Sequence, residues 1–314
     1  MILKGQNFRL LYRTGTNDFK VFAKSTSCTV NLTGNTESAE HKDVLGMASM
    51  PTIVSKAWSL SVDSLEVTDY DMLLSLTKDC VKITVEWDET GTTDNQTPQA
   101  ETFSRRGEAY INDMTLVFND REISTKNLQM TGTGALQFVD PSEDYEVVTV
   151  SNTFIKGDSV RLFLGAPTPN MVVAAAKQLS FHVSVSLEST TTKDTTGDWD
   201  VQEPTAVNFD ISTSALVKSN ETITSTVQGV KLNDFEDIFE SAAPVSFQIA
   251  RVSGANNRTK GDLMVSGSVI LTQLTINGPN RANADYSAQM QGYGTFTIHG
   301  SASSSSNMPD SGNL

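Results

Sequence analysis

The chain has 314 residues and carries 23 basic against 37 acidic side chains, for a formal net charge of −14. This excess of negative charge disfavours binding to phosphate backbones and to anionic membrane surfaces, and therefore a sequence-specific DNA-binding role. Hydrophobic residues reach 38% and charged residues only 19%, which excludes disorder throughout and favours a β protein with a Ser/Thr-rich surface. At roughly 150 residues per domain, the length predicts two domains.

The beginning of the chain has no apolar run of signal-peptide length, and Lys4 and Arg9 interrupt it. Nowhere do about 18 consecutive apolar residues occur, so we expect a soluble protein made in the cytoplasm. Two cysteines, Cys28 and Cys80, are too few for a disulfide framework. Both fall in alternating apolar patterns, which predicts two buried free thiols.

Four segments of the first half alternate apolar and polar residues with β-branched enrichment, and each predicts a half-buried strand: 28–32, 58–62, 81–87 and 114–118. One helix is expected among them at 68–77. Thr68 and Asp71 have capping-box spacing, and Tyr70, Leu73 and Leu74 form an apolar stripe.

The second half repeats the first. QMTGTG at 129–134 returns as QMQGYG at 289–294, an offset of 160 residues, and Gly107 meets Gly267 at the same offset. Toward the N-terminal end of each repeat the offset changes slightly, as insertions in surface loops would produce. The further matches are Arg9 and Leu10 with Arg161 and Leu162; Cys28, Val30 and Leu32 with Phe181, Val183 and Val185 at 153; Lys42 and Asp43 with Lys193 and Asp194; Trp58 with Phe209; Leu73 with Ile238; and Val81, Ile83 and Val85 with Val245, Phe247 and Ile249 at 164.

This duplication predicts a first unit at 1–140, a linker at 141–157, a second unit at 158–300 and a flexible tail at 301–314. The fold class expected is mainly β: two tandem, similar β-sandwich or barrel-like units, each with one short flanking α-helix. In the second helix, Asn233 and Glu236 are expected to repeat the cap. The repeated structural positions are Trp58 and Phe209, Leu73 and Ile238, and the glycines Gly132, Gly134, Gly292 and Gly294.

Catalytic patterns are missing. The three histidines, His41, His182 and His299, have no nucleophile or zinc motif around them, and we expect structural or solvent roles for them. Asp198 and Asp200 do not continue with calcium-loop spacing. The sequence therefore predicts no enzyme, no catalytic residue, no cofactor and no metal.

The order of features in the first unit resembles the major tail protein, or tail tube protein, of long-tailed bacteriophages. The resemblance lies in the strand after Lys24, the Lys42–Asp43 pair, the SxSxD strand at 59–63, the helix and the closing GxG. It covers the first unit and, through the duplication, the second.

The resemblance implies a virion structural protein whose strands join those of neighbours into a continuous barrel. Rings of six units then stack into a tube with an acidic lumen that conducts DNA. Family members carry one unit, so two units per chain imply a trimer that forms a pseudo-hexameric ring. A hexamer with one unit of each chain at the lumen is the alternative.

The implied partners are the chain itself, other tail proteins such as the tape measure, terminator and baseplate, and DNA in transient, non-specific passage, with no membrane. The implied location is the virion tail, after assembly in the host cytoplasm. Two long polar loops, 34–51 and 89–106, are candidates for contacts between stacked rings. The residues selected are Lys42, Asp43, Gly91, Thr92, Asp94, Gln96, Glu101, Lys193 and Asp194.

Two other functions fit the sequence. A tail terminator, connector ring or baseplate component would share the unit without stacking. A carbohydrate-binding or adhesin-like β-repeat protein would need exposed aromatic platforms. Trp58 and Trp87 lie in strand patterns and are expected in the core, which leaves Trp199 as the one free loop aromatic.

Overall fold

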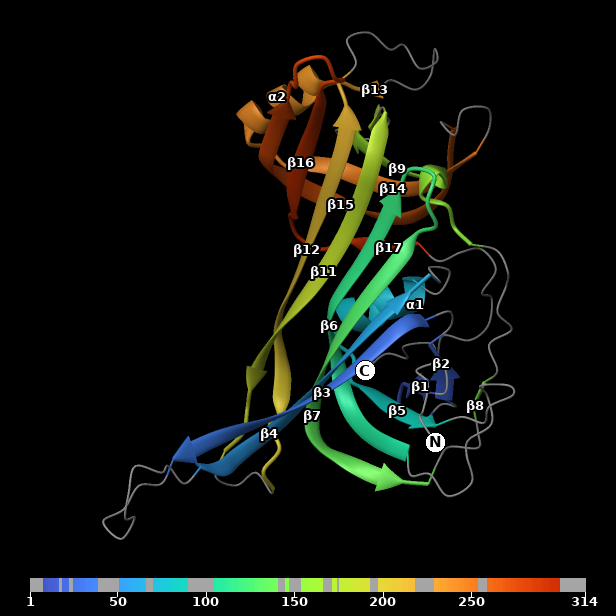
Figure 1. Cartoon of the computed structure of the whole chain (residues 1–314). Helices are drawn as coiled ribbons and strands as arrows, with labels where there is room; N and C mark the ends of the chain where they lie inside the picture. The colour runs from blue at the N-terminus through green and yellow to red at the C-terminus, as the bar shows by residue number, and fades with distance from the viewer. Residues whose placement is uncertain are drawn as a thin grey trace, which may run out of the picture.

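A computed structural model describes residues 8–16, 19–22, 25–38, 51–65, 70–89, 104–140, 145–146, 154–165, 171–173, 175–192, 197–217, 229–253 and 259–299. The predicted fold class is confirmed, because strands dominate and the described residues contain two short α-helices, one in each half. Figure 1 shows the two halves stacked lengthwise, with the long strands of the middle region running past both.

The first half contains β1 (Phe8–Arg13), β2 (Phe19–Val21), β3 (Ser25–Ser38), β4 (Pro51–Ser64), α1 (Tyr70–Lys78), β5 (Ile83–Glu89), β6 (Ser104–Asn119), β7 (Thr125–Val139) and β8 (Tyr145–Glu146). A short 3-10 turn, η2 (Gly157–Ser159), leads into the second half. That half contains β9 (Val160–Gly165), β10 (Met171–Val173), β11 (Ala176–Ser189), β12 (Gln202–Leu216), β13 (Gly229–Val230), α2 (Leu232–Ser241), β14 (Val245–Ser253), β15 (Thr259–Asn277), β16 (Asp285–Gly292) and β17 (Thr297–Ile298).

The two halves have the same strand order. In the first half the antiparallel pairings run β2-β1-β5-β6-β7-β4-β3. In the second they run β10-β9-β14-β15-β16-β12-β11. Even a bulge recurs, between Ile111 and Asp113 of β6 and between Leu271 and Gln273 of β15. Each strand of one half in these two series therefore has a counterpart in the other.

The cross-strand registers correct two of the sequence alignments. Val30 lies opposite Leu60, and Phe181 lies opposite Ile211, so β3 matches β11 at an offset of 151 rather than 153. The same comparison matches β5 with β14 at 162 rather than 164. A shift of two residues keeps every side chain on its face, and the hydrophobic alternation cannot detect it.

The core of each half lies between β4 or β12 on one side and β5 or β14 on the other. The ring centroids of Trp58 and Trp87 are 5.9 Å apart, and those of Phe209 and Phe247 are also 5.9 Å apart. The two tryptophans are buried, as predicted. A Cβ at Gly132 would overlap the Trp58 indole, and one at Gly292 would overlap the Phe209 ring. Glycine at these positions lets strand and aromatic ring approach closely.

Both helices lie where the sequence predicts them, but the second begins earlier. The carboxylate of Asp234 accepts a hydrogen bond of 2.7 Å from the backbone N–H of Lys231, which caps α2. The predicted cap at Asn233 and Glu236 is therefore wrong, because α2 starts at Leu232. At α1, Thr68 lies outside the described residues, while Asp71 accepts a hydrogen bond of 2.8 Å from the Met72 N–H.

Candidate functional site

The two halves are joined by a direct pairing of β6 with β11. The register runs from Asn119 opposite Gln178 to Asp113 opposite Ser184. The other end of β6, from Arg105 to Ala109, pairs with β5 of its own half. The bulge at Asn112 separates these two stretches. A single long strand thus belongs to one sandwich at its beginning and binds the other half at its end.

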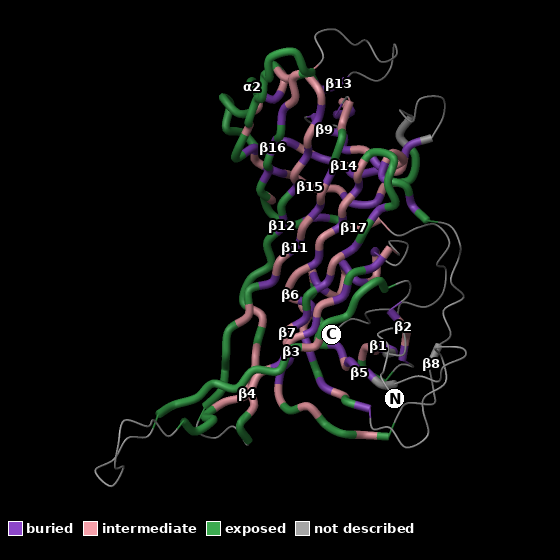
Figure 2. The backbone as a smooth tube through the Cα atoms, viewed as in Figure 1, coloured by how far each residue is buried: buried purple, intermediate pink, exposed green. Residues whose placement is uncertain are grey.

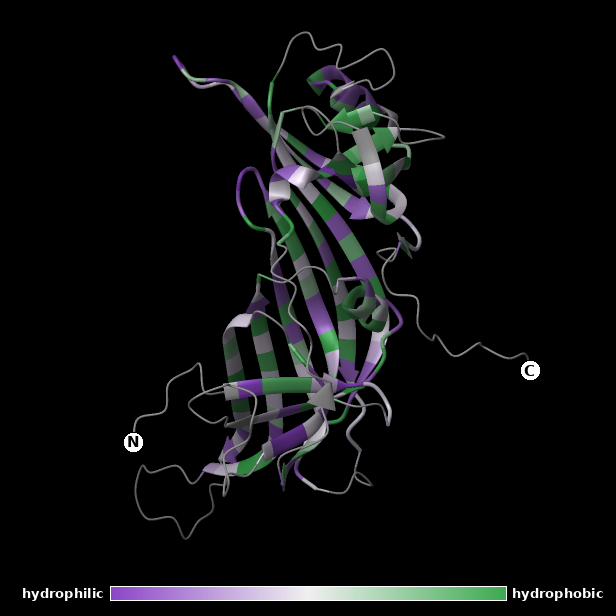
Figure 3. Cartoon of the chain, turned by 90° about the vertical axis from the view of Figure 1, so that its right-hand side faces the viewer, coloured by the Kyte–Doolittle hydropathy of each residue, from purple (hydrophilic) through white to green (hydrophobic). Residues whose placement is uncertain are grey.

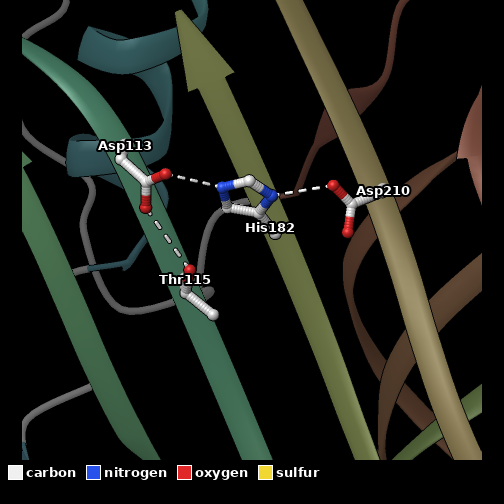
Figure 4. Close-up of polar contacts among 4 residues, drawn as sticks. All are labelled: Asp113, Thr115, His182 and Asp210. Atoms are coloured by element: carbon white, nitrogen blue, oxygen red, sulfur yellow. Dashed lines mark hydrogen bonds and ion pairs between the residues drawn. The ribbon is translucent and has the colours of Figure 1, made fainter.

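A histidine bridges this joint on one face of the sheet (Figure 4). Nε2 of His182 lies 2.7 Å from Oδ2 of Asp113 on β6, and Nδ1 lies 2.7 Å from Oδ1 of Asp210 on β12. Carboxylates only accept hydrogen bonds, so both ring nitrogens carry a proton and the imidazole is cationic. The hydrogen bond with Asp210 contributes most to raising the pKa of His182 to about 9, and the bond with Asp113 adds to it against partial burial.

The other face of the joint is apolar and closed. Leu116 and Phe118 of β6 and Leu179, Phe181 and Val183 of β11 are all at most 3% exposed. Helix α1 packs over β6 and β11. The phenol of Tyr70 also donates a hydrogen bond of 2.8 Å to the carbonyl of His299, in the second half. The halves therefore share one core across the joint.

The joint makes one continuous antiparallel sheet of eight strands, in the order β3-β4-β7-β6-β11-β12-β16-β15. Alternate residues of these strands pack into the cores, and the colour alternation in Figure 3 follows this pattern. The opposite face is polar. Two of its rows are Asp63, Asn127, Thr115, His182, Asp210, Gln291 and Val117, Ser180, Ser212, Gln289, Gln273.

The polar face carries mild negative charge. Every residue of the two rows is half-buried or exposed, and Val117 is the one apolar member. Neither row contains a lysine or arginine, while Asp63 and Asp210, together with the neighbouring Asp113, contribute carboxylates. His182 offsets part of that charge. The face can therefore stay wetted without offering cations to a phosphate backbone.

Both outer edges of the eight-stranded sheet are open among the described strands. β3 pairs with β4 alone, although its counterpart β11 pairs on both sides. The stretch of β15 from Gln273 to Asn277 pairs with β16 alone, although its counterpart in β6 also pairs with β11. Figure 2 shows β3 largely exposed along its length. Open edges are sites at which another strand can add.

Several predicted residues lie outside the described part of the chain. These are the stacking candidates Lys42, Asp43, Gly91, Thr92, Asp94, Gln96, Glu101, Lys193 and Asp194. The predicted loop bounds are also partly wrong, because β3 continues to Ser38 and β4 begins at Pro51, while β5 ends at Glu89 and β6 begins at Ser104. The tail at 301–314 and most of the linker at 141–157 are likewise outside the described residues.

Two predictions about side chains are wrong. Cys28 is exposed and Cys80 is half-buried, although both are free thiols. Cys28 is exposed because β3 is an open edge. Trp199 is not a free loop aromatic, because its side chain packs against the core. Its backbone forms an isolated parallel β-bridge with Lys56, and the Lys56 ammonium lies 6.0 Å from the centroid of its ring. This contact docks the β11–β12 hairpin on β4 of the first half.

Within the described ranges, no group of three or more His, Cys, Asp or Glu side chains has an arrangement that could hold a metal ion. The helices that the structure describes are too short and too polar to cross a membrane.

The sequence matches no protein-family profile and no curated protein. Two solved structures are similar to parts of it: the tail of an empty gene transfer agent particle and the virion of a native gene transfer agent particle. Their identities are 15% and 16%, with TM-scores of 0.37 and 0.34. Each alignment covers 46% of this chain and 98% of the other.

Proposed function

We propose that the chain is a structural protein of a phage-like virion tail, and that its copies join edge to edge into rings that stack as a tail tube. The observation that carries this proposal is the eight-stranded sheet with an open edge at each end. The two edges belong to different strands, β3 and β15. A contact between unlike edges is heterologous, so repeating it produces a closed ring or an open filament.

The ring proposed is a trimer with pseudo-sixfold symmetry. Each chain already contains two halves with the same strand order, joined through β6 and β11. Three chains would close a barrel of 24 strands, eight from each, and closure would leave no edge of this sheet exposed.

The proposed role of the lumen is to conduct DNA. Its wall would be the polar face, because the opposite face of the sheet is filled by the cores. Carboxylates such as Asp63 and Asp210 repel phosphates over a Debye length of about 8–10 Å at physiological salt. Without lysine or arginine in its central rows, the wall lets DNA slide without holding it.

The proposal includes no catalytic activity, and it assigns contacts between stacked rings to the segments predicted from the sequence, 34–51 and 89–106. Other tail proteins would bind the ends of the tube, and the tube would form part of the virion tail.

Native mass spectrometry of the purified chain, with negative-stain images of the same sample, tests the proposal. Three-chain assemblies that appear as hollow rings and stack into tubes would support it. Rings that never stack, at any concentration, would assign the chain to a terminator or connector instead. A six-chain ring would contradict the trimer, and a monomer without assemblies at high concentration would overturn ring formation itself.

A further inference from the structure

We infer that the open edge of β15 in one copy pairs with the open edge of β3 in a second copy, in the register that β6 and β11 use inside each chain. Helix α2 of the first copy closes over the new pair, as α1 closes over the internal one. The inference rests on the proposed function and specifies the interface through which the ring would close.

The register follows from the counterparts of the internal joint. β6 matches β15 at an offset of 160, and β11 matches β3 at 151. Inside the chain Leu116 lies opposite Phe181, and Met114 lies opposite Val183. Transferring these pairs places Ile276 opposite Val30 and Leu274 opposite Leu32. The pair of Phe118 with Leu179 becomes Gly278 opposite Cys28.

The exposure of apolar side chains on β3 supports this pairing. Phe181 and Val183 of β11 are both 0% exposed. Their counterpart Leu32 is 60% exposed, and Val30 is half-buried. On the facing strand, Ile276 is 50% exposed. Large apolar side chains in opposite positions of two open edges would be covered by each other.

The helices show the same contrast. Leu73 and Leu74 of α1 are 0% exposed, because α1 packs over both β6 and β11. Helix α2 packs on β15, and of its corresponding residues Ile238 is half-buried and Phe239 is 49% exposed. A second copy of β3 beside β15 would lie where β11 lies under α1, and would cover Phe239.

A fourth exposed residue fits the same contact. In the second half, β17 with Ile298 lies beside α1, and Ile298 is half-buried against the core. At an offset of 160 its counterpart is Phe138, which is 70% exposed at the end of β7. Bringing the first half of a second copy onto α2 would place Phe138 where Ile298 lies in the internal joint. The exposed residues of both edges are thus explained by one contact.

The polar side of the interface differs from the internal joint. The counterparts of Asp113, His182 and Asp210 are Gln273, Asn31 and Ser59, all neutral. Amides and hydroxyls can both donate and accept hydrogen bonds, so this trio needs no protonation to pair. The joint between copies should therefore hold at a pH at which the His182 bridge is lost.

We assign a second copy of the chain to each open edge, because a single chain carries both complementary surfaces. β15 with α2 forms the receiving side, and β3 with the end of β7 forms the inserted side. The structure already contains one example of this pairing, between its two halves. A contact of the same geometry between chains continues the internal one.

A disulfide tests the register directly. Gly278 has open space where a Cβ would lie, so Gly278→Cys should be tolerated. In a Cys80→Ser background, this thiol should lie opposite the native Cys28 of a second copy, at a Cβ separation that mild oxidation can bridge. We expect covalent dimers and trimers on a non-reducing gel, reversed by reductant.

Two control variants sharpen the experiment. Gly278→Cys with Cys28→Ser should give no crosslink. Asn277→Cys with native Cys28 should give none either, because adjacent residues of a strand point to opposite faces. Rings of the Gly278→Cys variant that form without a crosslink to Cys28, or a variant at position 277 that crosslinks equally well, would overturn the register while leaving the proposed function intact. Complete absence of rings would overturn both.

A charge substitution provides a second readout. Leu32→Asp should leave the monomer folded, since Leu32 is 60% exposed, yet raise the concentration needed for ring formation at least about tenfold, because it places a charge in the apolar contact. The matched control is Ile123→Asp, at an exposed apolar residue (40%) that belongs to neither β3 nor β15. Rings of Leu32→Asp that form as readily as those of the control would contradict the interface.

Discussion

Nε2 of His182 and Oδ2 of Asp113 lie 2.7 Å apart across the joint between the halves, although 69 residues separate them in the chain. The same imidazole reaches Asp210, so one side chain ties three neighbouring strands, β6, β11 and β12. The joint is therefore held on its polar face by a cation between two anions, and on its apolar face by a shared core.

The His182 bridge predicts a pH-dependent stability. The pKa of His182 rises from 6.5 to about 9 in the folded chain, mainly through Asp210. Its contribution is fully present below pH 6.5 and is lost as the pH rises through 9. The free energy of unfolding in urea should be about 1–2 kcal/mol higher at about pH 6 than at about pH 9.5. This figure is reduced for the partial exposure of the imidazole. His182→Gln should remove this difference; an unchanged pH dependence in that variant would contradict the prediction.

The first half contains a buried ion pair between Glu86 and Arg106. The Glu86 side chain is fully buried, and Arg106 Nη2 lies 2.6 Å from its Oε2, with Nε at 2.8 Å. Arg106→Met removes the cation and should lower the free energy of unfolding by about 3–5 kcal/mol, because it removes the charge that pairs with the buried carboxylate. The double variant with Glu86→Gln should recover part of the loss in chemical denaturation. A single variant as stable as the wild type would refute the role of the pair.

The glycines that contact aromatic rings should not accept a methyl group. Gly132→Ala and Gly292→Ala would drive a Cβ into Trp58 and Phe209, which should cost about 1–3 kcal/mol each. Gly278→Ala is the matched control, since nothing lies near its Cβ position. Thermal unfolding should separate the two kinds of variant, and equal midpoints would contradict the predicted crowding.

The proposed position of the polar face at the lumen wall predicts how assemblies would interact with DNA. Gln129 and Gln289 are counterparts at an offset of 160, and both are exposed on this face. Gln129→Lys with Gln289→Lys should leave assembly unchanged but make assemblies retain double-stranded DNA at low salt, with release at high salt. Gln129→Asn with Gln289→Asn controls for the substitution itself. Lysine assemblies that retain no more DNA than the asparagine control would argue against a lumenal position.

Deletion of residues 91–100 tests the proposed separation of ring closure from stacking. The deleted residues lie between β5 and β6 in the chain and belong to neither β3 nor β15. We expect rings that contain the same number of chains as those of the unmodified protein. Negative-stain images should show no tubes. Tubes of normal length would remove this loop from the stacking contacts, and loss of the rings would show that it contributes to closure.

Strand periodicity and internal repetition are enough to predict the fold class, both helices and parts of four strands in the first half, at 28–32, 58–62, 81–87 and 114–118. They cannot determine register, since moving β3 against β11 by two residues leaves the same side chains facing inward. The His182 bridge is also beyond their reach. The sequence places His182 on the face opposite Phe181, but only the pairing of β6 with β11 brings Asp113 beside it. Local pattern carries no information about a partner 69 residues away.

Under the proposed function, covalent connection of the halves would also affect assembly kinetics. The β6–β11 joint forms within one chain, so its rate is first order and does not depend on protein concentration. In a ring of three chains, half of the six joints would exist before any two molecules meet, and the three remaining joints would complete the circle. A single-unit protein would need six. In the proposed ring, fusion of two units would therefore lower the concentration at which closed rings outcompete partial ones. It would also permit the two kinds of joint to acquire different side chains, such as His182 and Asn31.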